Sequence, residues 1–208
     1  MDTEFVKIAV GVAILVCGLA LMIIILLSKG RKRAERLAPA FELGTARPTG
    51  VLGSALEGLY RGFSCRYRIQ YPSQYDRGGA VLRLAVISSH QWTAELEKPG
   101  SRFLSRFWLI QDLAIGDREL DEHFRFAAKE EGVLKPLFGS EAVLDAMHIL
   151  TASENFESVH VRPEGVDIKW SPRAPKLDED PEALRTRLEL ATALVVACGY
   201  TPSLPPTQ

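Results

Sequence analysis

Residues 8–27 read IAVGVAILVCGLALMIIILL, and this apolar run decides how the chain folds. It contains 13 Ile, Leu or Val, three Ala, two Gly, one Cys and one Met, without a charged side chain. At about 1.5 Å per residue, a helix of this length reaches about 30 Å, the thickness of a bilayer's hydrocarbon core. Because backbone groups in lipid must satisfy one another, the run is predicted to be a transmembrane helix. It excludes a simple soluble protein.

The run is predicted to remain as an anchor and not to be removed as a signal peptide. Signal peptides have a basic start and about 7 to 15 apolar residues, whereas this run is longer and follows the acidic start MDTEFVK. The triplet Ala38-Pro39-Ala40 imitates a cleavage site, but it lies beyond a basic cluster and contains Pro.

Basic residues after the run predict its orientation. Only Lys7 precedes it, whereas a basic cluster follows, composed of Lys29, Arg31, Lys32, Arg33 and Arg36. Such a bias places the basic side in the cytoplasm and residues 1–7 outside. The same cluster can rest on anionic lipid headgroups. We therefore expect membrane lipid as a partner through the helix, with the C-terminal part cytoplasmic.

Small residues on the predicted helix suggest a second contact. Ala9, Ala13 and Cys17 recur every four residues, a spacing that lets two membrane helices approach closely. A homodimer is one interpretation, and chance spacing of small residues is the other.

Composition then divides the remaining chain. Residues 28–54 are predicted to be a basic flank and flexible linker, because LAPAFELGTARPTGVLGS over 37–54 is rich in Pro, Gly and small residues and lacks a sustained period. Residues 55–198 have the length of one domain with its own core. Residues 199–208 are predicted to be a disordered tail.

The first half of this domain is predicted to form strands. Residues 63–71 alternate, with apolar side chains on one face and Ser64, Arg66, Arg68 and Gln70 on the other. Further strands are expected over 56–60, 81–88 and 92–97, and Pro163-Glu164-Gly165 joins 156–161 and 166–170 as a hairpin.

Helices are predicted in the middle and at the end. Ser140 is an expected N-cap for a short helix, and Asp180-Pro181-Glu182 is a strong start for a helix that Gly199 ends. Segregated strands and helices indicate an α+β fold, with one N-terminal transmembrane helix and a mainly antiparallel sheet packed by the C-terminal helix.

The densest polar stretch is GDRELDEHF at 116–124. Asp117, Asp121 and His123 are candidate metal ligands or an acid–base set. In the simpler interpretation, which we favour, Asp117 caps a short helix and the other polar residues are solvated. The histidines lack metal-ligand spacing, and Cys65 and Cys198 fall at core positions. No catalytic residue, metal site or cofactor is predicted.

Charge is distributed unevenly. From Arg47 to Arg83 there are six Arg and two acidic residues, whereas from Leu84 onward there are 13 basic and 20 acidic residues. Arg66 and Arg68 share one strand face and are candidate contacts for an anionic surface, although a solvated strand face explains them more simply. No phosphate-binding loop is present, and nucleic acid is not a predicted partner.

Two short patterns, Leu56-x-Gly58-x-Tyr60-Arg61-Gly62 and Gly116-Asp117-x-x-Leu120-Asp121-x-x-Phe124, together with the order of elements, carry a resemblance. Over about residues 50–198 the chain resembles uncharacterised membrane-anchored bacterial proteins of unknown function. The resemblance implies a bacterial origin, and hence the inner (plasma) membrane, but no activity or site.

These observations lead to two functional hypotheses. The favoured one is a single-pass, non-enzymatic interaction module that binds a protein or lipid surface at the inner membrane. The alternative is a membrane-tethered hydrolase or metal-dependent enzyme that uses Asp117, Asp121 and His123.

Overall fold

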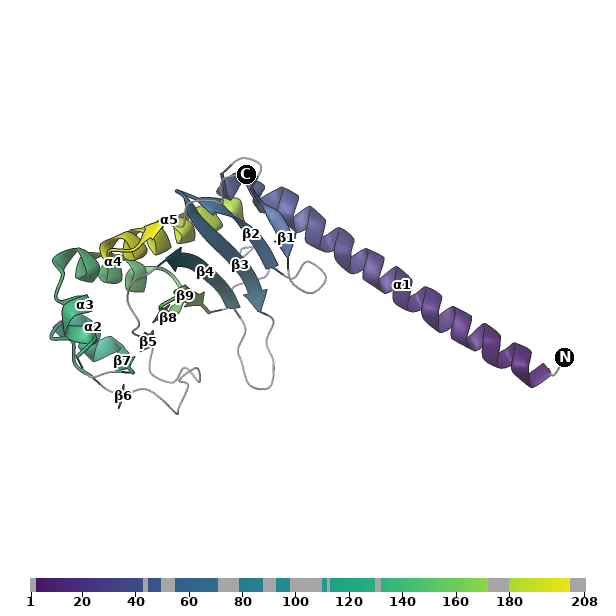
Figure 1. Ribbon diagram of the computed structural model, residues 1–208, viewed down its shortest axis with the longest axis horizontal. Coiled ribbons are helices and arrows are strands. Elements are labelled where there is room, and N and C mark those ends of the chain that lie inside the picture. Colours follow the sequence, from purple (N-terminus) through teal and green to yellow (C-terminus); the bar gives the residue numbers. More distant parts are fainter. Residues whose placement is uncertain are drawn as a thin grey trace.

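A long helix protrudes from a domain in which helices cover one face of a single sheet (Figure 1). The structure is a computed structural model, and it describes residues 3–42, 45–49, 55–70, 79–87, 93–97, 110–111, 113–129, 132–171 and 180–202. The fold is α+β, with an N-terminal apolar helix, an antiparallel sheet and a C-terminal helix packed on that sheet, as the sequence predicted.

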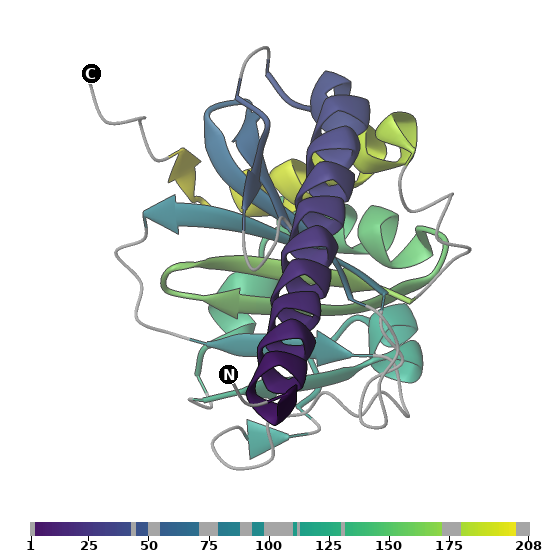
Figure 2. The same ribbon diagram turned by 90° about the vertical axis from the view of Figure 1, so that its right-hand side faces the viewer.

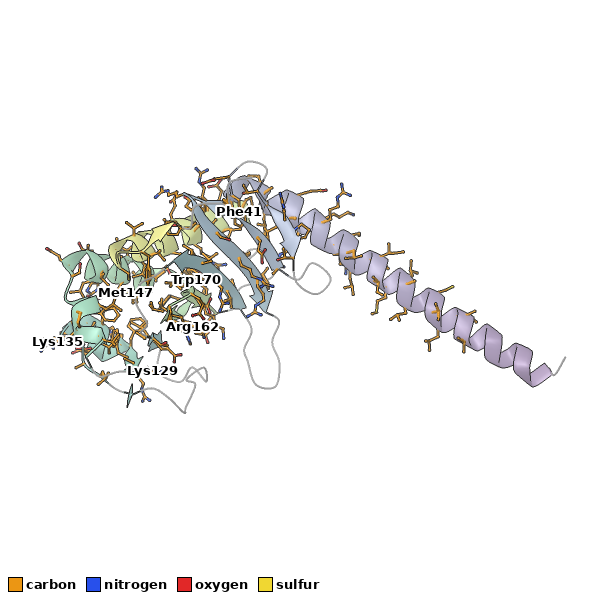
Figure 3. All side chains as sticks on the ribbon, viewed as in Figure 1. Phe41, Lys129, Lys135, Met147, Arg162 and Trp170 are labelled. Atoms are coloured by element: carbon orange, nitrogen blue, oxygen red, sulfur yellow. The ribbon has the colours of Figure 1, made fainter. Side chains whose placement is uncertain are left out.

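Helix α1 (Thr3–Leu37) has a free part and a packed part. One 18-residue window within Gly11–Ala40 has a mean hydropathy of 2.9 and no buried residue, so the helix is long and apolar enough to cross a membrane. Gly11 and Gly18 are exposed, whereas Gly30, Ala34 and Leu37 are buried at helical spacing. Figure 3 accordingly shows the side chains of α1 standing clear of the domain over most of its length.

The segment after residue 27 differs from the predicted flexible linker. Here α1 continues to Leu37, the 3-10 helix η1 (Ala38–Ala40) follows, and Phe41 is only 7% exposed. Strand β1 (Arg47–Thr49) then joins the sheet. This stretch is rich in Pro, Gly and small residues, but two isolated large apolar residues, Leu37 and Phe41, place it in the core. Residues 43–44 and 50–54 of the predicted linker lie outside the described residues.

Every described strand pair is antiparallel, and the order across the sheet is β1-β2-β3-β4-β9-β8-β5-β7-β6, with β10 beside β4. The strand bounds after β1 are β2 (Ala55–Tyr60), β3 (Phe63–Gln70), β4 (Gly79–Ile87), β5 (Ala94–Glu97), β6 (Ile110–Gln111), β7 (Arg125–Ala128), β8 (Phe156–Arg162), β9 (Gly165–Trp170) and β10 (Thr201–Pro202). The predicted strands and the hairpin of β8 and β9 are confirmed. The pair 201–202, predicted as part of a disordered tail, forms β10 instead, and 203–208 lie outside the described residues.

Four helices of the described chain belong to the domain: α2 (Arg118–His123), α3 (Leu134–Phe138), α4 (Glu141–Ala152) and α5 (Pro181–Ala197). Asp180 caps α5, as predicted, because its carboxylate accepts from the Glu182 backbone N–H, and Gly199 follows the helix at φ 78°. Ser140 is the N-cap residue of α4, but its hydroxyl makes no capping hydrogen bond.

The core lies between the helices and one face of the sheet, here called the inner face. Phe63, Cys65 and Tyr67 point to this face from β3 and are at most 1% exposed, while Leu184 and Leu188 of α5 are fully buried against it. Ser64, Arg66 and Arg68 alternate with them and are exposed. They lie on the opposite face, the outer face.

The junction of α1 with the sheet depends on the absence of a side chain at residue 58. A Cβ there would lie 2.5 Å from the Phe41 ring. We predict that Gly58→Ala lowers the stability by about 1–3 kcal/mol through overpacking, or the unfolding temperature by about 3–10 °C. Thermal unfolding followed by tryptophan fluorescence measures the change.

Gly132→Ala is the matched control, since its Cβ would meet nothing within 4 Å. In a Phe41→Leu background, which loosens the contact, the cost of Gly58→Ala should shrink. If the two substitutions change the free energy of unfolding additively, the Phe41 ring is not in close contact with residue 58 of β2.

Candidate functional site

The basic cluster at the end of α1 divides into two groups. Lys29, Arg31, Lys32 and Arg36 are exposed. Arg33 is half-buried, with its guanidinium carbon 5.7 Å from the centre of the Tyr67 ring. Four of these residues are therefore placed at the surface around α1, and the fifth packs into the domain.

Tyr67 links this end of α1 to helix α5. Arg187 of α5 is 6% exposed, donates from its guanidinium to the Tyr67 hydroxyl at 3.0 Å and lies 5.1 Å over the Trp170 ring. Cation–π contacts of desolvated arginines are worth about 2 kcal/mol. These contacts of Arg33, Tyr67, Arg187 and Trp170 thus fasten the end of α1 to both layers of the domain.

Sequence reasoning missed Arg187. The available signal was its spacing, since it lies three residues after Leu184 and four before Ala191, on the apolar face of α5. A cation at such a position requires a buried partner.

A row of charged residues crosses the outer face. Residues directly opposite in antiparallel pairs share a face, and the strand registers place one such residue in each of seven neighbouring strands. In order across the sheet, the row consists of Arg47, Glu57, Arg66, Arg83, Asp167, His160 and Glu95. It is called the charged row below.

One end of the charged row is cationic and open to solvent. Arg66 lies 3.4 Å from Glu57 and keeps 47% of its side chain exposed. Arg83 is 42% exposed and donates two hydrogen bonds to Asp167, which raise the pKa of its guanidinium. Arg47 and Arg68 are also exposed, and within the described chain neither has an ion pair. The predicted candidates Arg66 and Arg68 do share this face.

The other end of the charged row is buried. The imidazole of His160 and the carboxylate of Glu95 lie 3.1 Å apart, with 3% and 4% of their side chains exposed. Beside them, Lys169 pairs with Glu157 at 3.2 Å, and the Ser171 hydroxyl donates to the same carboxylate. Removing one partner of a buried pair costs about 3–5 kcal/mol. These pairs therefore hold the central strands in one register.

Around α2, two carboxylates accept hydrogen bonds from nearby backbone N–H groups. Asp117 caps α2 by accepting from the Leu120 backbone N–H at 2.9 Å, and Asp121 accepts from the backbone N–H groups of Ile115 and Gly116. His123 is exposed. The partner of Asp117 is a residue the sequence reasoning left unassigned, His148 of α4, whose Nε2 lies 2.9 Å from a carboxylate oxygen.

These contacts match the simpler interpretation of the 116–124 stretch, in which Asp117 is a cap. In the described part of the chain, no group of three or more His, Cys, Asp or Glu side chains is placed to hold a metal ion. Asp117, Asp121 and His123 are accordingly not assembled as a metal site.

The two cysteines of the domain are shielded. Cys65 is fully buried, and burial raises the pKa of its thiol to about 12. Burial also raises the pKa of Cys198 to about 12. At neutral pH both are thiols rather than the thiolates that act as nucleophiles. The prediction that Cys65 lies in the core is confirmed.

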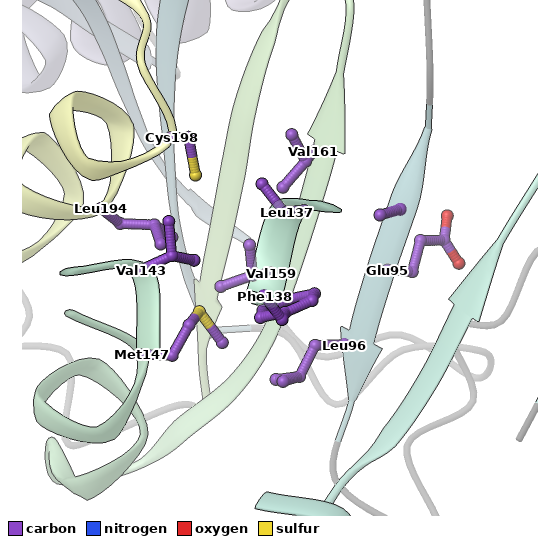
Figure 4. Close-up of a pocket in the computed structure, with 11 residues that line it drawn as sticks. Glu95, Leu96, Leu137, Phe138, Val143, Met147, Val159, Val161, Leu194 and Cys198 are labelled. Carbon is purple, nitrogen blue, oxygen red and sulfur yellow. The ribbon is translucent and has the colours of Figure 1, made fainter. Parts of the chain in front are cut away.

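A small apolar cavity lies between the sheet and helices α3, α4 and α5 (Figure 4). Its volume is about 10 Å³, room for about one water molecule. Leu96, Phe138, Met147 and Leu194 are among the lining residues, and the carboxylate of Glu95 points away from it. A space of this size and polarity is a packing gap, because it can neither hold a ligand nor bind water well.

Comparison with known proteins gives little beyond this geometry. No family model matches the chain, and no curated protein matches it. Among solved structures it is similar to the crystal structure of the mycobacterial trehalose monomycolate transport factor A, TtfA, with 14% identity and a TM-score of 0.49 over 86% of this chain and 97% of that one. The proposals below rest on the chain's own residues.

The capping of α2 by Asp117 makes the stability of the protein depend on pH. The backbone hydrogen bond from Leu120, and next the contact with His148, lower the pKa of Asp117. The ionised carboxylate of Asp117 thus contributes fully to the stability of the folded protein above the usual pKa of an aspartate, near 4. This contribution is lost as the pH falls through the lowered pKa.

We predict that Asp117→Asn is less stable than wild type by up to about 1 kcal/mol at pH 7, because the amide lacks the negative charge that a helix N-terminus favours, and that this difference narrows as the pH falls below about 4. Urea unfolding at stepped pH values measures both curves. Asp145→Asn, a charge change at an exposed position of α4, should follow the wild-type curve. If the difference in the free energy of unfolding between Asp117→Asn and wild type stays constant with pH, the negative charge of Asp117 does not stabilise the cap.

The raised thiol pKa values predict inert cysteines. At pH 8 a thiol with a pKa of about 12 is about one part in 10⁴ thiolate. In a Cys17→Ala variant, a thiol reagent should therefore label Cys65 and Cys198 only after unfolding, as mass spectrometry can show. Rapid labelling of either residue in the folded protein would instead reveal an activated thiol.

Proposed function

We propose that this chain is a single-pass membrane protein whose residues 8–27 cross the bilayer and whose domain is a non-enzymatic interaction module at the cytoplasmic face. The observation that carries the proposal is the division of α1. Over residues 11–27 its apolar part has no buried residue, and its last turns are built into the core of the domain.

The packed end of α1 argues against removal of the helix. Cleavage after Ala40 would take away Leu37, which is fully buried, and Ala34, which is 6% exposed. Burial of a leucine side chain stabilises a fold by about 1.5–3 kcal/mol. The domain would lose this contribution and expose the inner-face residues that the helix covers.

The basic cluster supports the orientation. Lys29, Arg31, Lys32 and Arg36 are exposed directly after the apolar part, where positive charge favours the cytoplasm. The inner membrane of a bacterium remains the expected location, on the resemblance described above. Ala13 and Cys17 are exposed on α1, so the small-residue stripe is available for a homodimer.

An interaction module fits the described residues better than an enzyme. The stretch around Asp117 and Asp121 uses its carboxylates for capping, and the pocket under α4 is a packing gap. Two surface features are left to explain among the described residues: the basic end of α1, and the outer face of the sheet with its exposed arginines. Such surfaces recognise anionic groups on lipids or proteins.

The orientation is tested by protease accessibility. In intact spheroplasts, the domain should resist added proteinase K, and in inverted membrane vesicles it should be digested. A periplasmic marker and a cytoplasmic marker control the integrity of each preparation. Digestion in intact spheroplasts, or a mature chain that begins beyond residue 27, would overturn the proposal.

Crosslinking in native membranes, followed by purification under denaturing conditions, tests the interaction. An interaction module should yield a defined crosslinked species, of lipid or protein, that a variant without the basic cluster loses. If no such species forms, the domain is not an interaction module.

A further inference from the structure

The junction of α1 fixes the distance between the domain and the bilayer. Gly30 is buried only three residues after Leu27, the last residue of the apolar run, or about 4.5 Å along the helix axis. The headgroup layer on each side of a bilayer is about 5–8 Å thick. If α1 spans the membrane, the domain therefore begins within the headgroup layer.

The junction also fixes which face of the domain meets the bilayer. Helices α3, α4 and α5 cover the side of the sheet turned away from the protruding end of α1 (Figure 1). The outer face is consequently turned toward the side from which α1 enters, and Figure 2 shows the domain from that side, with the N-terminal end of α1 nearest the viewer. Packed residues on both sides of the junction, Leu37 and Phe41, hold this orientation.

Most charged residues of the outer face close to α1 are basic. Strand β1, with the exposed Arg47, packs against α1, and Arg66, Arg68 and Arg83 follow on β3 and β4. Neighbouring strands are about 4.8 Å apart, so these arginines cover about 14 Å of the sheet. They are called the arginine face below.

Acidic neighbours neutralise only part of the arginine face. Glu57 lies beside Arg66 in an exposed pair, and Asp167 is shared between Arg83 and Arg162. The exposed pair of Arg66 with Glu57 is of the weak kind. Three of the five guanidinium charges, counting Arg162, remain uncompensated among these residues.

From this placement we infer that the arginine face is a second membrane contact, which binds the headgroups of anionic phospholipids. Arg47, Arg66 and Arg68 supply the charge, and Arg83, held by two hydrogen bonds to Asp167, keeps the strands in place. The inference rests on the proposed insertion of α1 and names the partner of the module. The anchor then serves for attachment, and the arginine face makes the attachment sensitive to lipid charge.

Full-length protein in lipid nanodiscs tests this inference. A fluorophore on Ser64→Cys, an exposed position on the outer face two residues before Arg66, reports contact with a quencher attached to lipid headgroups. The Cys17→Ala background leaves only the two shielded cysteines. We expect strong quenching in discs of phosphatidylcholine with phosphatidylglycerol, weak quenching in phosphatidylcholine alone, and loss of the difference at 1 M salt.

The variant R66Q/R68Q should shift the docking equilibrium by about 25-fold, since an arginine near an anionic surface is worth about fivefold, or about 1 kcal/mol. R118Q/R185Q is the matched control, because it removes the same charge from exposed residues of α2 and α5, and it should shift the equilibrium less than twofold. Both variants change exposed side chains, and unfolding temperatures near wild type will verify their folding.

Four results would overturn the inference. Equal quenching in the two lipid mixtures, or equal effects of the two variants, would remove the lipid contact while α1 stays inserted. Loss of a crosslinked protein in R66Q/R68Q with unchanged quenching would assign the arginine face to a protein partner. Failure of the chain to stay in the discs would refute the proposed anchor itself, and with it this contact.

Discussion

The structure depends on the burial of the last turns of α1 in the domain. Leu37 and Phe41 together contribute about 3–6 kcal/mol by the usual value for large apolar side chains. Helix α1 and the sheet are consequently packed together, and a flexible tether does not separate them.

The outer face combines two electrostatic environments on one continuous row. Near α1, where side chains reach solvent, arginines outnumber carboxylates and their pairs are weak. On β8 and β5 the row is buried, and pairs such as His160 with Glu95 fix the register of the central strands. One face thus carries buried ion pairs at its centre and exposed arginines at its edge.

Periodicity predicted most of the fold because it reports burial directly. The alternation around Cys65 and the spacing that begins at Leu184 each identified an element and its buried face. The junction was missed because Leu37 and Phe41 stand alone among Pro, Gly and small residues, where no period can form. The charged row could not be read from the sequence, since it depends on strand order, and β9 lies between β4 and β8 only in the folded sheet.

The same limit applies to the candidate sites. Asp117 was recognised as a cap from local spacing alone, but its partner His148 comes from another helix, 31 residues later in the chain. Arg66 and Arg68 were found because one strand carries both. Arg47 and Arg83 join them only through the register of β1 to β4.

Because the junction is rigid, a tilt of α1 moves the whole domain with it. The sheet extends over eight strand spacings from β1 beside α1 to β6, about 38 Å along its width. Helices tilt when bilayer thickness changes, and a tilt of about 10° would move the far edge by about 7 Å. If α1 spans a bilayer, a stiff junction would therefore couple the thickness of the lipid around α1 to the position of a surface well away from it.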